Sequence, residues 1–316
     1  MTARCDLPPP MQAGIGDQPF ERIAPDMAVG AAYTQCLDAL RVMGCDSPGR
    51  DARELFAFAT GFDRLAVLSA PDVLLNAEQA ARLANVLTRR AGGEPVSRIC
   101  GQREFYGRLF QISPEVLDPR PDTETLVDVA LDLYRAGRLG QAPRILDFGT
   151  GSGAIVLTLL AEIPDATGVG LDASQPALRV AQRNANQFGP DVARRVSWLH
   201  AADLSNRHGC FNLVVANPPY IPTTEIPCLQ CEVRDFDPHM ALDGGADGLD
   251  IVRLLATRLL HVVPDGYCLV EIGAGQATRA IQIFTSVVPK HCLANIWTQQ
   301  DLLGHERCVA MQTRGV

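Results

Sequence analysis

The sequence predicts an α/β protein in which a small helical domain and a β-hairpin linker precede a doubly wound, mostly parallel sheet. Three observations carry this prediction. Short apolar runs alternate with helix-length segments over residues 144–312, residues 27–93 are helical in pattern throughout, and residues 94–121 hold two apolar runs interrupted by glycines. Strands separated by helices of this length are typical of βαβ units, which build parallel sheets.

The chain divides into four expected segments. Residues 1–26 contain five prolines and no long apolar run, so we expect a flexible tail and not a signal peptide. The other segments are the helical domain at 27–93, the hairpin linker at 94–121 and the sheet domain at 122–316.

The helical domain and the linker each carry local signals. Asn76 is the expected N-cap of a helix that runs to Arg90, where Gly92 and Gly93 follow. In the linker, the apolar runs Val96–Cys100 and Phe105–Ile112 are expected to form the two strands of the hairpin.

The sheet domain is expected to contain seven strands in a Rossmann-like arrangement. These strands are Arg144–Phe148, Gly168–Leu171, Val196–His200, Phe211–Ala216, Tyr267–Ile272, Ala294–Thr298 and Arg307–Gln312. The helices expected between them are Ala154–Ile163, Gln175–Phe188, Leu249–Val262 and Gln276–Val288.

Charge and composition exclude several classes of protein. The 316 residues carry a net charge of −8 with a pI near 5.3, which disfavours direct nucleic-acid binding because phosphates require clustered Lys and Arg. No apolar stretch is long enough to span a membrane. The ten cysteines are scattered, as expected of reduced thiols in a cytoplasmic protein. Cys228 and Cys231 have C-x-x-C spacing without a second pair, so we expect no metal site.

A glycine-rich loop directly follows the first predicted strand. The run Gly149-Thr150-Gly151-Ser152-Gly153 leads into a helix, and its glycines allow a sharp turn and close approach of a ligand to the backbone. Asp172 ends the next strand, about 20 residues later, where a carboxylate can accept hydrogen bonds from ribose hydroxyls. NAD and S-adenosylmethionine both contain that ribose, so these residues indicate an adenosine-type ligand without deciding between the two.

Three further residues bear on this ligand. Asp203 follows the third predicted strand, where it or its neighbour Leu204 could contact the adenine. Asp147 directly precedes the glycines and could reach the amino group of a methionine moiety. Because a carboxylate is a poor neighbour for the pyrophosphate of NAD, Asp147 favours S-adenosylmethionine.

The fourth strand ends in the tetrapeptide Asn217-Pro218-Pro219-Tyr220, which is the most specific motif of the chain. The prolines stiffen the loop and remove two N–H donors. The Asn217 side-chain oxygen and the Pro218 carbonyl can then each accept one N–H of a planar –NH2 group, on which the Tyr220 ring can stack. Such a site would position an amide or aromatic amine for methyl transfer without a strong base.

Together these residues resemble the protein-glutamine N5-methyltransferases of the HemK/PrmC family. The resemblance extends from about Met27 to the C-terminus. Besides the two motifs above, it rests on the segments Gly101–Gly107, Pro119–Glu124, Glu232–Arg234 and Ala241–Asp250. The R-P-D-T-E run at residues 120–124 is similar to the branch that modifies peptide chain release factors.

The resemblance implies a fold, a reaction and a partner. The fold would be the seven-stranded Rossmann-like domain of class I methyltransferases. The reaction would be transfer of a methyl group from S-adenosylmethionine to the glutamine of a Gly-Gly-Gln tripeptide in a class I peptide chain release factor. Residues 149–153, Asp172 and Asn217 would bind the cofactor, Asn217 to Tyr220 would hold the glutamine amide, and the helical domain would hold the protein substrate.

Other functions stay open on the sequence alone. A DNA adenine-N6 methyltransferase uses the same tetrapeptide on a flipped base, although this acidic chain shows no basic stripe. A ribosomal-protein glutamine methyltransferase, a cofactor-binding module without activity and an NAD oxidoreductase are the remaining alternatives.

Overall fold

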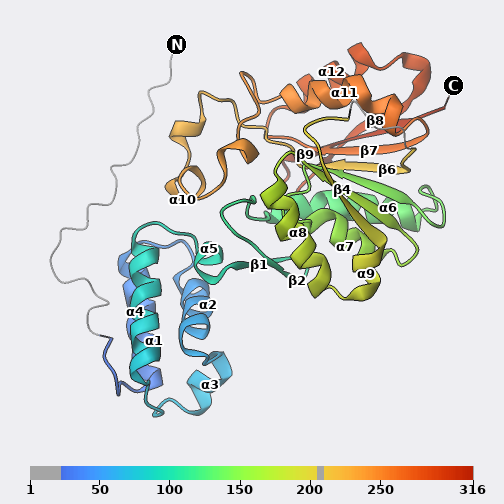
Figure 1. Cartoon of the computed structure of the whole chain (residues 1–316). Coiled ribbons are helices and arrows are strands. Elements are labelled where there is room, and N and C mark those ends of the chain that lie inside the picture. The colour runs from blue at the N-terminus through green and yellow to red at the C-terminus, as the bar shows by residue number, and fades with distance from the viewer. Residues whose placement is uncertain (1–22, 205–209, 316) are drawn as a thin grey trace. The chain divides into compact units, whose positions relative to one another are not determined.

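The computed structural model describes residues 23–204 and 210–315, which form two compact units (Figure 1). Of the described residues, one unit comprises 23–101 together with Gln230–Phe236, and the other comprises 102–204, 210–229 and 237–315. Most of the predicted flexible tail, residues 1–22, lies outside the described residues. The described end of that segment belongs to the helical unit, because Ile23 is buried in its core and the Asp26 amide donates to the Leu75 carbonyl.

The helical unit packs its helices around one apolar core. The predicted N-cap at Asn76 is confirmed as a capping box, in which the side chains of Asn76 and Gln79 each accept from the other residue's backbone N–H. The helices are α1 (Val29–Val42), α2 (Pro48–Thr60), α3 (Arg64–Ser69), α4 (Ala77–Ala91), α5 (Val96–Cys100) and α10 (Cys231–Arg234).

The short segment Gln230–Phe236 belongs to the helical unit although it is distant in sequence. Its helix α10 carries Glu232, which forms an ion pair of 2.6 Å with Arg90 at the end of α4. Arg90 is largely buried and also faces Asp51 of α2 at 3.6 Å. A buried guanidinium with two carboxylate neighbours is well compensated, so the pair ties this segment to α2 and α4.

The predicted hairpin is present, but its strands are β1 (Gln102–Phe105) and β2 (Arg108–Gln111). The expected strand Val96–Cys100 is wrong, because these residues form α5 between Pro95 and a left-handed Gly101. The expected strand Phe105–Ile112 is also wrong as drawn, since the turn falls inside it. Tyr106 and Gly107 both have positive φ, which is the requirement of a two-residue hairpin turn.

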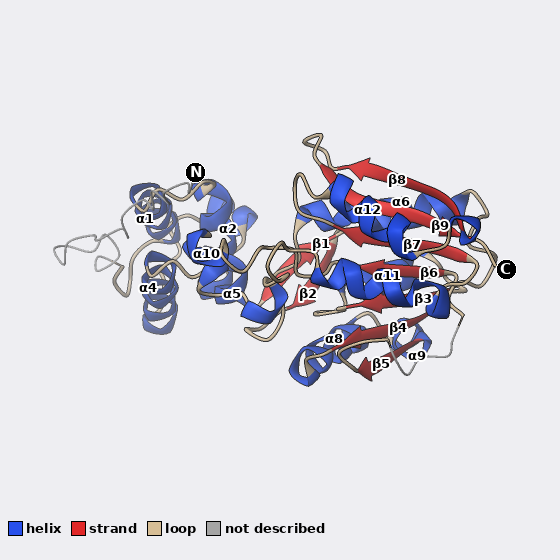
Figure 2. Ribbon diagram, turned by 90° about the horizontal axis from the view of Figure 1, so that it is seen from above, coloured by secondary structure: helices blue, strands red, loops and turns tan. Residues whose placement is uncertain are grey.

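The sheet of the larger unit has seven strands in the order β5-β4-β3-β6-β7-β9-β8 (Figure 2). The first five in this order are parallel, and β9 runs antiparallel to both β7 and β8. The strands are β3 (Arg144–Phe148), β4 (Thr167–Asp172), β5 (Val196–His200), β6 (Leu213–Ala216), β7 (Gly266–Glu271), β8 (Leu293–Gln300) and β9 (Glu306–Thr313). The predicted seven-stranded sheet is therefore confirmed.

Helices cover both faces of this sheet (Figure 1). On one face, α6 and α7 pack on alternate residues of β3, β6 and β7, and on the other face α11 and α12 pack on the residues between them. Burial on both faces explains why the central strands are continuously apolar. The helices of this unit are α6 (Glu124–Arg135), α7 (Ala154–Glu162), α8 (Gln175–Gln187), α9 (Pro190–Arg195), α11 (Asp250–Val262) and α12 (Ala277–Val287).

No helix within residues 23–204 and 210–315 combines the length and apolar character that a membrane crossing requires.

Gly266 offers a test of how tightly the central strands approach one another. A Cβ added there would lie 2.5 Å from the carbonyl oxygen of Asn212 and 2.9 Å from Cγ2 of Val263. Because a backbone carbonyl cannot move cheaply, Gly266→Ala should lower the free energy of unfolding by about 1–3 kcal/mol in urea titrations. Gly49→Ala in α2 is the control, because nothing lies within 4 Å of the added Cβ. It should be neutral or stabilising by up to about 1 kcal/mol. Equal losses in both variants would contradict this interpretation.

Candidate active site

The sheet register brings three separate sequence motifs to one edge. Phe148 of β3 pairs with Leu171 of β4 on one side and with Ala216 of β6 on the other. The next residue of each strand or loop is Gly149, Asp172 and Asn217, respectively. This edge is where helices on opposite faces leave a crevice between neighbouring parallel strands, which is the usual ligand site of such folds.

The glycine loop turns sharply around one carbonyl group. The amides of Gly149 and Thr150 both donate to the Leu171 carbonyl, at 2.8 and 2.9 Å. Gly149, Gly151 and Gly153 have φ angles of 73°, 54° and 81°, a region that other residues adopt only with strain. The predicted loop therefore needs glycine at all three positions to expose its backbone at the mouth of the crevice.

Asp172 fastens this loop to the neighbouring strand. One carboxylate oxygen accepts from the Gly151 amide and the other from the Ser174 amide, both at 2.8 Å. Burial raises the pKa of Asp172, while these backbone bonds lower it. A carboxylate has about four acceptor positions, so Asp172 can accept further hydrogen bonds from a ligand in the crevice.

Asp147 lies beneath the glycine loop and is fully buried. Its Oδ2 atom accepts from the Thr150 hydroxyl at 2.7 Å and from the Val156 amide at 3.3 Å. Its Oδ1 atom is buried and has no hydrogen-bond partner among the described residues. Asp147 is absent from the lining of the pocket described below, where we had expected it to meet an amino group. In this structure the carboxylate supports the loop from below.

Asn217 is oriented by a residue far away in sequence. Its Nδ2 atom donates to Oγ1 of Thr123, the residue before α6, at 2.9 Å. Its Oδ1 atom is buried and makes no hydrogen bond within the described part of the chain. A buried acceptor without a partner costs free energy, and a donor on a bound molecule would recover it.

Backbone contacts hold the rest of the tetrapeptide. The Tyr220 carbonyl accepts from Nε2 of Gln276 at 2.9 Å. A Cβ added to Gly248 would lie 2.1 Å from that carbonyl oxygen, and one added to Gly244 would lie 2.7 Å from the Pro219 carbonyl oxygen. Burial raises the pKa of the Tyr220 phenol to about 12, so the ring stays neutral at physiological pH.

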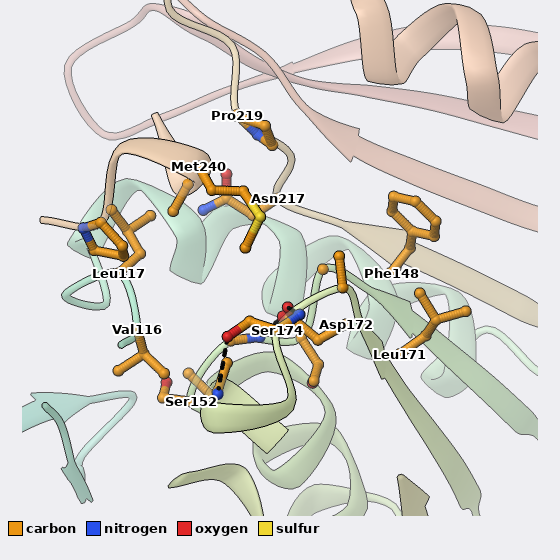
Figure 3. A pocket seen from close by; sticks show the side chains of 18 of the residues that line it. Val116, Leu117, Phe148, Ser152, Leu171, Asp172, Ser174, Asn217, Pro219 and Met240 are labelled. Atoms are coloured by element: carbon orange, nitrogen blue, oxygen red, sulfur yellow. Dashed lines mark hydrogen bonds between the residues drawn. The ribbon is translucent and has the colours of Figure 1, made fainter. Parts of the chain in front are cut away.

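One pocket collects most of the predicted site residues (Figure 3). Figure 3 shows Asn217, Pro219 and Met240 facing Ser152, Asp172 and Ser174 across it. Of the residues predicted from sequence, those that line the pocket are Gly149, Thr150, Gly151, Ser152, Asp172, Asn217 and Pro219.

The other predicted site residues lie behind or beside the pocket wall. Gly153 is the N-cap residue of α7, and Pro218 and Tyr220 belong to the loop around Asn217. Asp203 and Leu204 also lie off the wall, since the residues there are Ala201 and Ala202. Leu204 instead packs in the core beneath α11.

The sequence did not single out several residues that form the site. Thr123 and Met240 line the pocket, as do residues 115–117 in the stretch between the hairpin and α6. Glu271, the last residue of β7, is buried at 1% exposure behind Thr123. Residues 120–124 lie in a segment that carries the family resemblance, which places them near the methionine end of the cofactor, but nothing in a single sequence marks Thr123 as the partner of Asn217.

The sheet order, the reversed last hairpin and the glycine loop at the crevice define a class I methyltransferase fold. The hMettl16 catalytic domain, solved in complex with the MAT2A 3'UTR hairpin 6, has the same fold. It matches with a TM-score of 0.53 at 14% identity, covering 75% of this chain and 82% of that one. A family model described as the methyltransferase small domain matches residues 129–227, and one described as the PrmC N-terminal domain matches residues 31–101.

Relatives of known name extend over nearly the whole chain. The release factor glutamine methyltransferase of Bradyrhizobium diazoefficiens is 46% identical over 253 residues, which cover 78% of this chain and 84% of the relative. The protein of the same name from Rhodospirillum rubrum is 41% identical over 300 residues, or 95% of this chain and 89% of the relative. The chain belongs to the release factor glutamine methyltransferase family, as its motifs indicated.

The buried carboxyl group beneath the glycine loop should make stability depend on pH. Burial raises the pKa of Asp147 to about 7, so the folded protein holds this proton more tightly than the unfolded chain, whose Asp pKa is about 4. The contribution to stability is complete below pH about 4 and is lost as the pH rises to about 7. Asp147→Asn should therefore reduce the difference in free energy of unfolding between pH 4.5 and pH 8.

Urea titrations of the ligand-free protein at both pH values test this. Asp165→Asn, which changes an exposed carboxylate before β4, should leave the difference as in the wild type. An unchanged difference in Asp147→Asn would show that this group does not produce the pH dependence.

Proposed function

We propose that the chain transfers a methyl group from S-adenosylmethionine to the side-chain amide nitrogen of glutamine in the Gly-Gly-Gln motif of class I peptide chain release factors. Membership of the family supports methylation of a protein glutamine. The observation that best supports a glutamine amide as the acceptor is the orientation of the Asn217 amide. Its nitrogen donates to Thr123, and its oxygen is a buried acceptor without a partner among the described residues.

The crevice fits S-adenosylmethionine. The glycine loop brings its backbone close to the pocket, and the Asp172 carboxylate lies on the pocket wall with acceptor positions for two ribose hydroxyls. Apolar residues of the wall, among them Leu171 and Ile251, suit the adenine ring. When bound, the cofactor supplies an electrophilic methyl group on a sulfonium.

The tetrapeptide suits a planar amide acceptor. In an amide, conjugation withdraws the nitrogen lone pair, so the protein must turn the –NH2 group and favour electron density on nitrogen. We propose that Asn217 Oδ1 accepts one N–H of the glutamine and the Pro218 carbonyl accepts the other, while the neutral Tyr220 ring stacks on the amide plane. The contribution of these residues is then positioning and electrostatic stabilisation.

The partner is proposed to be a protein and not a nucleic acid. The net charge of −8 is unsuited to neutralising phosphates beside the pocket, whereas a Gly-Gly-Gln loop needs no charged partner. Its glycines allow a backbone to enter a narrow cleft, and its glutamine is long enough to reach a methyl donor. We propose that the helical unit contributes the surface that holds the release factor.

Asp172→Ala should weaken the binding of S-adenosylmethionine by about 1–3 kcal/mol, because charge-assisted hydrogen bonds to the ribose and the fastening of Gly151 are lost together. Isothermal titration calorimetry measures the dissociation constant directly. Asp165→Ala, which changes an exposed carboxylate, is the control and should bind as the wild type does. An unchanged dissociation constant in Asp172→Ala would remove this residue from the cofactor site.

Asn217→Ala should slow methyl transfer by about 2–4 kcal/mol of activation free energy while leaving the fold intact, since the lost acceptor acts on the transferring amide. Single-turnover assays with a purified release factor and radiolabelled S-adenosylmethionine measure this. Near-wild-type turnover by a folded, cofactor-binding Asn217→Ala protein would show that another group holds the amide.

The acceptor itself is identified by competition. Equal amounts of a class I release factor, ribosomal protein and adenine-containing duplex DNA are offered to the wild-type enzyme with radiolabelled S-adenosylmethionine. Peptide mapping should find the label on the glutamine of the Gly-Gly-Gln motif. Label in the DNA, in the ribosomal protein or at another residue of the release factor would overturn the proposed function.

A further inference from the structure

Asn217, Thr123 and Glu271 form a chain of hydrogen bonds that ends in a buried carboxylate. Asn217 Nδ2 donates to the Thr123 hydroxyl oxygen at 2.9 Å. The Thr123 hydroxyl also interacts with the buried Glu271 carboxylate, and a hydrogen bond from this hydroxyl lowers the pKa of that group. Thr123 and Glu271 are 4% and 1% exposed, so solvent is a poor substitute for either partner.

The sheet register explains why these three residues meet. Ala216 of β6 pairs with Val270 of β7, so Asn217 and Glu271 occupy equivalent positions one residue further along. Thr123 closes the short 3-10 turn Pro121–Thr123 that leads into α6, and α6 packs across the end of β7. The hydroxyl of Thr123 thereby reaches both neighbouring strands.

The number of available hydrogens fixes the direction of each bond. An ionised carboxylate only accepts, and a threonine hydroxyl has one hydrogen to give. Once Thr123 donates that hydrogen to Glu271, its oxygen can only accept from Asn217. The Asn217 amide must then present Nδ2 to Thr123 and keep Oδ1 free, which is the orientation in which it can accept a hydrogen bond from a substrate.

We propose that Glu271 and Thr123 are positioning residues that hold the Asn217 amide in the orientation that accepts the substrate N–H. This inference rests on the proposed function, because it assigns how the acceptor site for the glutamine amide is kept in its active form. Neither residue needs to touch the reacting atoms, since both act through Asn217.

Charged and titratable groups on three segments of the chain interact with Glu271. Arg120 and Asp122 lie on the segment before α6, Tyr220 lies on the acceptor loop, and Arg307 and Cys308 lie on β9. Arg307 is itself paired with Asp122 at 3.0 Å and with Asp301 at 3.1 Å. The arginines lower the pKa of Glu271 and Asp122 raises it.

Burial outweighs these effects and raises the pKa of Glu271 to about 7. Above that pH the carboxylate accepts from Thr123 as described. Below it, the acid proton of Glu271 can be donated to Thr123, whose own hydrogen can then be donated to Asn217 Oδ1 once the Asn217 amide has turned over. Methyl transfer should therefore fall as the pH drops through about 7, and this dependence should belong to Glu271.

The experiment compares four full-length variants in single-turnover assays with a release factor and radiolabelled S-adenosylmethionine. Thr123→Val removes the hydroxyl at nearly constant shape. It should lower the transfer rate roughly 10- to 100-fold, as expected when the residue that positions the substrate amide, Asn217, loses a buried hydrogen bond. Thr123→Ser restores the hydroxyl and should recover most of the rate. Glu271→Gln should lose the decline near pH 7, whereas Thr123→Ser should keep it.

The fourth variant combines Thr123→Val with Asn217→Ala. Because Thr123 acts through Asn217, its loss should cost little more in the Asn217→Ala background, within about twofold. Calorimetry with S-adenosylmethionine checks that each variant is folded and binds the cofactor. Should Thr123→Val fail to fold, the pH profile of Glu271→Gln still tests the inference.

The outcomes separate this inference from the proposed function. If the wild type does not methylate the release factor, the proposed function fails. If the wild type is active but Thr123→Val matches it, the positioning role is wrong. Additive losses in the double variant, or a decline near pH 7 that persists in Glu271→Gln, would likewise overturn it.

Discussion

The pairing of β3 with its two parallel neighbours is the constraint on which the site depends. A parallel ladder in register aligns the carboxyl ends of its strands, so the residues after Phe148, Leu171 and Ala216 arrive at one edge together. If β3 slipped by one residue, each of its side chains would move to the opposite face of the sheet. The glycine loop would then be separated from Asp172 and Asn217. Apolar residues on both faces of the central strands, held under α6, α7, α11 and α12, fix that register.

Two buried carboxyl groups support the two halves of the crevice in similar ways. Asp147 lies under the glycine loop and holds Thr150, and Glu271 lies behind the acceptor loop and holds Thr123. In each case a threonine hydroxyl links the acid to the residues at the pocket. Each acid also has one oxygen without a hydrogen-bond partner among the described residues, so both groups are costly to ionise in place. The predicted pH dependences of stability and of activity are thus both assigned to groups that do not touch the reacting atoms.

The sequence predicted the sheet well because its signals are local. Strands that are apolar over their whole length and end in glycine or a polar motif are found within two residues of the predicted ends. The run Val96–Cys100 is as apolar as a strand, but Pro95 and Gly101 bound a single helical turn, which periodicity over so few residues cannot distinguish. Helix α6 was not predicted, although Leu126, Ala130 and Leu133 lie at helical spacing on its buried face. The bond between Thr123 and Asn217 joins residues 94 positions apart, and a hydrogen bond at that separation leaves no periodic trace in one sequence.

The segment Gln230–Phe236 gives the protein an unusual modular character. It belongs to the helical unit, to which the Arg90–Glu232 ion pair ties it. The residues before and after it in the sequence belong to the larger unit. A gene rearrangement that replaced only the N-terminal part of the chain would separate this segment from Arg90. Glu232 would then lose its ion-pair partner. The helical unit therefore depends on a segment that the chain supplies from within the larger unit, and loss of Arg90 would remove the ion-pair partner of a residue more than a hundred positions away.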